Sequence, residues 1–178
     1  MGKVEGSWSG MRKYLEKEML AECLRGRIRY GCTAYVGMDG KRIFEICLDG
    51  EPLKRFSWET VNTYFIQQGL KPAAEVDGIV GYWSGFVALL HRVPMEARPE
   101  YTDEEFCGAL EVYRSQGIQD SLRSDDPLVR MFAILDRRVG RRTLASLGAD
   151  VGRQPAWLQR LYLARMAAQG LPGAQEQA

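Results

Sequence analysis

The sequence has few of the residues from which active sites are usually built. His91 is its one histidine, which excludes metal sites with several histidines and disfavours mechanisms that need a histidine base. No Cys-x-x-Cys pair occurs among Cys23, Cys32, Cys47 and Cys107, which argues against a zinc knuckle. The chain also lacks a phosphate-binding glycine loop and a nucleophile elbow. We therefore expect free thiols, no metal and no cofactor.

Long apolar runs and a strong net charge are missing as well. No run is long enough to cross a bilayer, and residues 1–8 contain no apolar signal core, so we expect a cytoplasmic protein without a membrane partner. The net charge of +1 provides no global attraction to nucleic acid, so such binding would depend on local patches. A length of 178 residues, 46% of them hydrophobic and 26% charged, is typical of one globular domain.

The segment 125–144 predicts a complete helix followed by a second short one. Asp126 is a good N-cap, and Pro127 occupies the first helical position, where its missing N–H costs nothing. Apolar residues then recur at helical spacing, at Leu128, Met131, Phe132, Leu135 and Val139. Gly140 is placed to end the helix in the left-handed conformation, with a short helix over residues 141–147.

Four arginines at the end of this helix form the most suggestive charge feature. Arg137 and Arg138 would lie in its last turn, where the helix dipole favours cations, and Arg141 and Arg142 follow at once. One interpretation is a patch that binds phosphates of nucleic acid or another small anion. The other is a solvated helix end paired with acids, since residues 95–126 contain nine acids against three arginines.

The first part of the chain predicts a helix and a three-stranded antiparallel meander. Apolar residues recur at helical spacing from Trp8 to Cys23, which indicates a helix from about Ser9 to Gly26. The strands are expected over 27–36, 41–48 and 51–56. Asp49-Gly50 is a two-residue hairpin signal that places Ile46 opposite Leu53 and Glu45 opposite Lys54.

The first turn of the meander decides which side chains share a face. A four-residue turn over 37–40 would place Tyr30 on the face of Glu45, whereas a three-residue turn over 38–40 places it with Phe44. Only the three-residue turn makes one continuous apolar face. The predicted inner face is then Tyr30, Cys32, Ala34, Val36, Phe44, Ile46, Leu48 and Leu53.

The predicted outer face of the sheet is polar. It carries Arg27, Arg29, Thr33, Glu45 and Lys54, with Tyr35, Ile43 and Phe56 at one end. Three-stranded sheets with basic residues on the open side can lie in a DNA major groove, where Arg27, Arg29 and Lys54 would reach phosphates or bases. The simpler interpretation is a solvent-facing side, because antiparallel sheets commonly leave one face wet.

Helices are predicted over most of the remaining chain. Ser57 caps a helix from Trp58 to Gln68, and an apolar helix over Ile79–Val93 follows. Thr102 and Glu105 form a capping box for a helix from Asp103 to about Ser115, and a last helix begins at Pro155 and ends at Gly170. The fold class is therefore α+β. We expect a single domain over 1–178, with a helix-sheet-helix module over 8–70, a helical module over 79–170 packed on it, and a disordered tail over 171–178.

Three stretches together carry a family resemblance. They are Trp8-Ser-Gly-Met-Arg-Lys-Tyr-Leu-Glu16, the run from Asp126-Pro-Leu-Val-Arg-Met-Phe to Gly-Arg-Arg-Thr-Leu144, and Gln154-Pro-Ala-Trp-Leu-Gln159. The chain resembles a small family of uncharacterised bacterial proteins, found mainly in Firmicutes, over nearly its whole length apart from residues 71–98. The resemblance implies a cytoplasmic bacterial origin and one shared architecture, and it carries over no catalytic residue.

Two classes of function follow from these observations. The first is a binding or regulatory protein without enzymatic activity, whose partner is a nucleic acid or a protein. It would act through the arginine cluster, the outer face of the sheet, or both. The second is an enzyme of unrecognised type, with a pocket between sheet and helices that uses carboxylates such as Glu45 or Asp136. The absence of the usual nucleophile–base and metal-ligand constellations favours the first.

Overall fold

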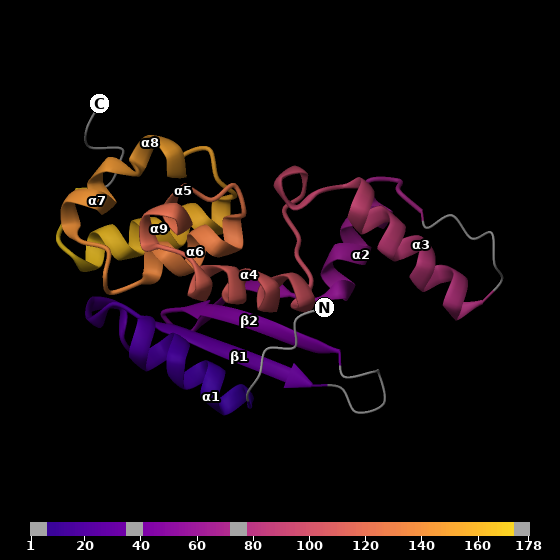
Figure 1. Ribbon diagram of the computed structural model, residues 1–178, viewed down its shortest axis with the longest axis horizontal. Helices are drawn as coiled ribbons and strands as arrows, with labels where there is room; N and C mark the ends of the chain where they lie inside the picture. The colour runs from indigo at the N-terminus through magenta and orange to yellow at the C-terminus, as the bar shows by residue number, and fades with distance from the viewer. Residues whose placement is uncertain (1–6, 35–40, 72–77, 173–178) are drawn as a thin grey trace.

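The computed structural model describes residues 7–34, 41–71 and 78–172 and shows the expected α+β fold. Strands β1 (Ile28–Ala34), β2 (Arg42–Leu48) and β3 (Glu51–Phe56) form an antiparallel sheet in the order β1-β2-β3. Helix α4 (Asp103–Ser115) lies between the sheet and the helices of the C-terminal half, α5 to α9 (Figure 1). The expected disordered tail and the first turn of the meander fall largely outside the described residues.

The predicted helix over 9–26 is wrong beyond its first turns. Ser7 caps the short helix α1 (Trp8–Lys13), which continues as a π-helical turn, η1 (Tyr14–Met19). Leu20 then adopts an extended conformation with φ −59° and ψ 135°, and a 3-10 turn, η2 (Glu22–Leu24), precedes β1. The helix ends at this point because the backbone of Leu20 pairs with that of Asp136 as an isolated antiparallel bridge.

The β1–β2 pairing keeps the predicted faces but not the predicted register. A three-residue turn would place Thr33 opposite Glu45, whereas the structure places Thr33 opposite Ile43. This shift of two residues leaves every side chain on its face, because strand side chains alternate with a period of two. Tyr30, Phe44 and Ile46 are accordingly buried on one face, while Ala34 at the strand end is exposed.

The second hairpin has the predicted turn but contains a bulge. Asp49 and Gly50 both adopt positive φ, at 54° and 88°, as a type I′ turn requires. The register then shifts between Cys47, which faces Pro52, and Ile46, which faces Lys54 rather than Leu53. Pro52 cannot donate to a strand ladder, and such irregularities are typical of edge strands. The bulge moves Lys54 and Phe56 onto the inner face, which corrects the prediction that both lie outside.

The main core joins the inner face of the sheet to the helices of the second half. Phe106 of α4 packs on Phe44 and Phe56 of the sheet, with ring centroids 4.8 and 4.9 Å apart, and on Phe132 of α6 (Pro127–Leu135) at 5.4 Å. Helices α5 (Ile118–Arg123) and α9 (Ala156–Ala168) pack on α6.

Helix α6 begins as predicted and ends a full turn early. Asp126 caps it and Pro127 is its first residue, but the helix stops at Leu135. Asp136 is extended, with φ −69° and ψ 135°, because it pairs with Leu20. Gly140 has a φ of −82° and therefore is not a left-handed terminator. It precedes α7 (Arg141–Ser146), which leads to α8 (Gly148–Val151).

A second, smaller core lies to one side of the first. Helix α2 (Trp58–Gln67) and helix α3 (Ile79–Arg92) bury Val61, Phe65, Phe86 and Leu89 between them. These helices lie away from α5 to α9 in Figure 1, and the 3-10 turn η3 (Met95–Ala97) leads from them to α4. Within the described ranges, every helix is too short or too polar to span a bilayer.

Candidate anion-binding surface

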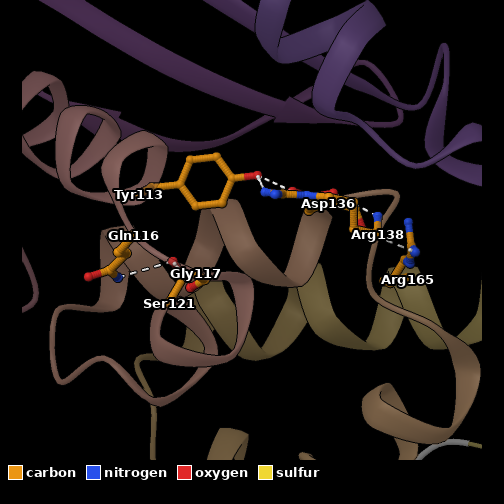
Figure 2. A network of polar contacts seen from close by, with 7 residues as sticks. All are labelled: Tyr113, Gln116, Gly117, Ser121, Asp136, Arg138 and Arg165. Carbon is orange, nitrogen blue, oxygen red and sulfur yellow. Dashed lines mark hydrogen bonds and ion pairs between the residues drawn. The ribbon is translucent and has the colours of Figure 1, made fainter.

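The turn after α6 is organised around the carboxylate of Asp136. Asp136 is 1% exposed, and its Oδ1 accepts the Arg138 backbone N–H at 2.7 Å, which is an Asx-turn. Its Oδ2 accepts the Arg138 Nε and Nη2 at 2.9 and 2.6 Å, and it also accepts the Tyr113 hydroxyl of α4. Figure 2 shows this network from close by. The carboxylate thus holds Arg138 and the turn against α4.

The electrostatics of this network follow from burial and from the donors around the carboxylate. Burial alone would raise the pKa of Asp136, but the hydrogen bonds from Arg138 and Tyr113 outweigh it and lower the pKa. Burial and the neighbouring carboxylate raise the pKa of Tyr113. The same carboxylate raises the pKa of Arg138. The aspartate is therefore ionised at neutral pH, and Arg138 neutralises it.

A second arginine supports the turn from the interior. Arg165 of α9 is 1% exposed, and its Nη2 donates to the backbone carbonyls of Val139 at 3.1 Å and Asp136 at 3.4 Å. Its Nε and Nη1 are buried without a hydrogen-bond partner. Burial lowers the pKa of this guanidinium, yet an arginine stays charged in proteins. The turn is therefore held by a buried cation that bonds to carbonyls alone.

The remaining arginines of the cluster are exposed on this turn and on α7. Arg137, Arg141 and Arg142 all lie on the surface, and none of them forms an ion pair with another residue that the structure describes. The Arg137 backbone N–H donates to the Met19 carbonyl at 2.9 Å, which fixes where this side chain leaves the backbone. The three exposed guanidinium groups, here called the arginine surface, are thus available to a ligand.

The predicted neutralisation of this cluster by residues 95–126 is wrong. Acids of that segment pair elsewhere: Glu100 with Lys54 at 2.6 Å, Glu104 with Lys41 at 3.0 Å, and Glu105 with Arg98. The predicted dipole explanation fails as well, because Arg137 and Arg138 lie beyond the end of α6. Of the four arginines, Arg138 alone has an acidic partner within the described ranges, and that partner is Asp136.

The sheet residues proposed for DNA contact are separated by the structure. Arg27 forms a two-pronged pair with Asp49, with both N–O distances at 2.7 Å. Lys54 is nearly buried on the inner face, where it bonds to Glu100 and lies 5.9 Å from the Tyr101 ring centre. Arg29 is exposed on the outer face. The bulge in β3 therefore removes Lys54 from the surface on which Arg29 lies.

The carboxylates proposed for an enzyme are engaged in structural contacts. Both oxygens of Asp136 accept hydrogen bonds, as described above. Glu45 accepts from Arg55 Nε at 2.6 Å and lies 3.6 Å from the Cys47 sulfur. In the part of the chain that the structure describes, no group of three or more His, Cys, Asp or Glu side chains could hold a metal ion.

Sequence reasoning named Asp136 as one carboxylate among others and missed Tyr113 and Arg165 as its neighbours. One signal for Arg165 is present in the sequence. The buried positions of α9 include Leu158, Leu161, Tyr162 and Met166, so Arg165 falls on the same face of the helix. A charge on an apolar stripe indicates a buried, bonded arginine. No pattern in the sequence indicates that Tyr113 faces Asp136.

The fold and the arginine surface together define an α+β protein with a basic end built from a turn between helices. A family model matches residues 7–166, and the chain belongs to the SF0329 protein family. The comparisons with curated proteins and with solved structures returned no match.

Proposed function

We propose that this chain is a non-enzymatic binding or regulatory protein of the bacterial cytoplasm that contacts the phosphates of nucleic acid through the arginine surface. The observation that supports the proposal best is the exposure of Arg137, Arg141 and Arg142 without an acidic partner in the described ranges. Guanidinium groups bind phosphate oxygens through paired N–H donors, and an unpaired group loses no internal contact when it does so.

The local charge favours an anionic ligand although the whole chain is nearly neutral. Residues 136–142 contain four arginines and one aspartate, whereas the net charge of the chain is +1. Positive charge is therefore concentrated in the turn after α6 and the start of α7, and a local excess of this kind attracts polyanions over a distance of roughly one Debye length, about 10 Å at 0.1 M salt.

The exposure of the three side chains favours a polymer over a small anion. A small anion is normally held by several groups that converge in a concave site. Arg137 lies on the turn, while Arg141 and Arg142 lie at the start of α7, and all three are exposed. Successive phosphates of a nucleic-acid backbone can be contacted one at a time by such groups. Phosphate contacts carry no sequence information, so binding should be independent of sequence.

The test is duplex DNA and RNA binding measured by fluorescence anisotropy over a series of salt concentrations. Each phosphate contact contributes about 0.9 to the slope of log K against log salt. We expect Arg137→Ala with Arg141→Ala to weaken binding and to lower that slope by roughly 1 to 2.

A charge-matched control is provided by Arg92→Ala with Arg123→Ala. Arg92 in α3 and Arg123 in α5 are both exposed. Replacing them with alanine removes the same amount of charge from other parts of the surface. This control should keep the wild-type slope. Wild-type binding that is unchanged in the Arg137/Arg141 variant, or lost equally in both variants, would contradict the proposal.

A further inference from the structure

We infer that Arg165, although buried, is a further determinant of anion binding, because its positive charge, which forms no ion pair with a described residue, strengthens the potential at the arginine surface. This inference rests on the function proposed above. Arg165 does not reach the ligand itself, since it is 1% exposed. It acts on the ligand through the turn that it supports and through the field of its charge.

The contacts place this charge directly behind the turn. Arg165 Nη2 lies 3.1 Å from the Val139 carbonyl oxygen and 3.4 Å from that of Asp136, so it spans the residues on either side of Arg137 and Arg138. Figure 2 shows Arg165 close to Asp136 and Arg138. The buried guanidinium thus bonds to both ends of the four-residue turn that carries the exposed Arg137.

Arg165 forms no ion pair with a residue that the structure describes, although the charge of Asp136 favours its protonated form through space. Asp136 is the nearest candidate, but its carboxylate is bonded to Arg138 and Tyr113 and is already neutralised by Arg138. The two remaining donor nitrogens of Arg165, Nε and Nη1, are buried without an acceptor. A buried cation without a paired acid is costly for a fold, and neutral side chains could bond to the same carbonyls.

The buried charge of Arg165 raises the positive potential at the surface above it. Protein interior screens charge far less than water does, so the field of a buried cation reaches a nearby surface. Arg137, Arg141 and Arg142, which have no acidic partner in the described ranges, repel one another and repel Arg165. A bound phosphate chain relieves this repulsion, so the energy that the like charges cost the free protein favours the complex.

The first test compares Arg165→Met with Arg165→Lys in the full-length protein, with duplex DNA as the probe. Methionine removes the charge at similar size, whereas lysine retains it and can donate to a carbonyl. We expect Arg165→Met to weaken DNA binding about threefold or more at low salt, and Arg165→Lys to restore most of that loss. A role limited to packing predicts no such rescue, because both substitutions alter the packing of the guanidinium.

A second test keeps Arg165 and offsets its charge with a new carboxylate on the same helix. Gln169 follows Arg165 by one helical turn, and its Oε1 is buried without a hydrogen-bond partner. Gln169→Glu places a carboxylate beside Arg165 with almost no change of shape and should weaken DNA binding. The matched control is Ala167→Glu, which adds the same charge at an exposed position of the same helix and should weaken binding less.

The outcomes separate this inference from the proposed function. If the wild type does not bind DNA, or if Arg137→Ala with Arg141→Ala has no effect, the proposed function fails. If the wild type binds and those arginines matter, but Gln169→Glu and Ala167→Glu behave alike, the role of Arg165 is refuted. Equal binding by folded Arg165→Met and Arg165→Lys refutes it as well. Circular dichroism and thermal melting of each variant establish that it is folded.

Discussion

Leu20 and Asp136 pair through their backbones, although more than a hundred residues separate them in the chain. The Ala21 N–H donates to the Leu135 carbonyl at 3.0 Å, and the Arg137 N–H donates to the Met19 carbonyl at 2.9 Å. These two bonds require extended backbone at both positions. They account for the end of η1 at Met19 and the end of α6 at Leu135. The bridge therefore creates the turn that carries Arg137 and leads to Arg141 and Arg142 at the start of α7.

Ala21→Pro should test the contribution of this bridge with little added backbone strain. Ala21 has a φ of −59°, and Leu20 before it is extended, so both conformations suit a proline at position 21. The substitution removes the N–H that reaches Leu135 and leaves a buried acceptor unpaired. We expect it to lower the free energy of unfolding by about 1–3 kcal/mol, measured by urea denaturation.

Glu22→Pro is the control for this experiment. Glu22 is exposed and is the first residue of η2, a position that tolerates proline. Glu22→Pro should change the free energy of unfolding by no more than about 0.5 kcal/mol. Equal destabilisation by the two prolines would show that the Ala21 hydrogen bond contributes nothing specific.

Asp136→Asn should destabilise the protein strongly at neutral pH. An asparagine can still accept the Arg138 N–H, but its amide group would face the donors of Tyr113 and the Arg138 side chain. It would also leave Arg138 without its acid. We expect a loss of about 3 kcal/mol in the free energy of unfolding. Asp125→Asn, at an exposed position just before α6, should have almost no effect.

The loss caused by Asp136→Asn should also depend on pH. The folded pKa of Asp136 lies below its unfolded value of about 3.9, so its ionised form stabilises the fold above that pH. The difference between wild type and variant should be constant from about pH 5 to pH 8. It should shrink below about pH 4, as the carboxylate is protonated in the unfolded and then in the folded chain. A difference that grows on acidification would exclude an ionised Asp136 in the native network.

Replacing Gly50 and Gly108 with alanine should change the free energy of unfolding in opposite directions. Gly50 has a φ of 88° in the β2–β3 turn, and Gly50→Ala would force an L-residue into the left-handed region at a cost of about 1–2 kcal/mol. Gly108 lies inside α4, and an added Cβ there meets nothing within 4 Å. Gly108→Ala should raise the free energy of unfolding by roughly 0.5–1 kcal/mol, because alanine favours the helix. Thermal melts of both variants provide the comparison, and two changes of the same sign would contradict the backbone assignment at Gly50.

The sequence by itself was sufficient where the determining interactions are local. The N-caps Ser57, Thr102 and Asp126 and the Asp49-Gly50 turn all form as predicted, because each involves residues within four positions of one another. The apolar face of the sheet was also predictable from alternation, since a register error of two residues leaves faces unchanged. The four arginines of the cluster could be named from the sequence, but their environment could not.

Tertiary structure decided the features that join distant parts of the chain. Apolar spacing continues through Val139, so a helix there satisfies the local pattern, yet the backbone leaves it to bond with residues 19–21. The bulge in β3 moved Lys54 to the inner face, where Glu100 and Tyr101 surround it. Whether an arginine is paired, exposed or buried depends on neighbours that other elements contribute. Here Tyr113 comes from α4 and Arg165 from α9. Helical periodicity indicates which side of a segment is apolar. It does not indicate which distant backbone groups compete for the hydrogen bonds of that segment.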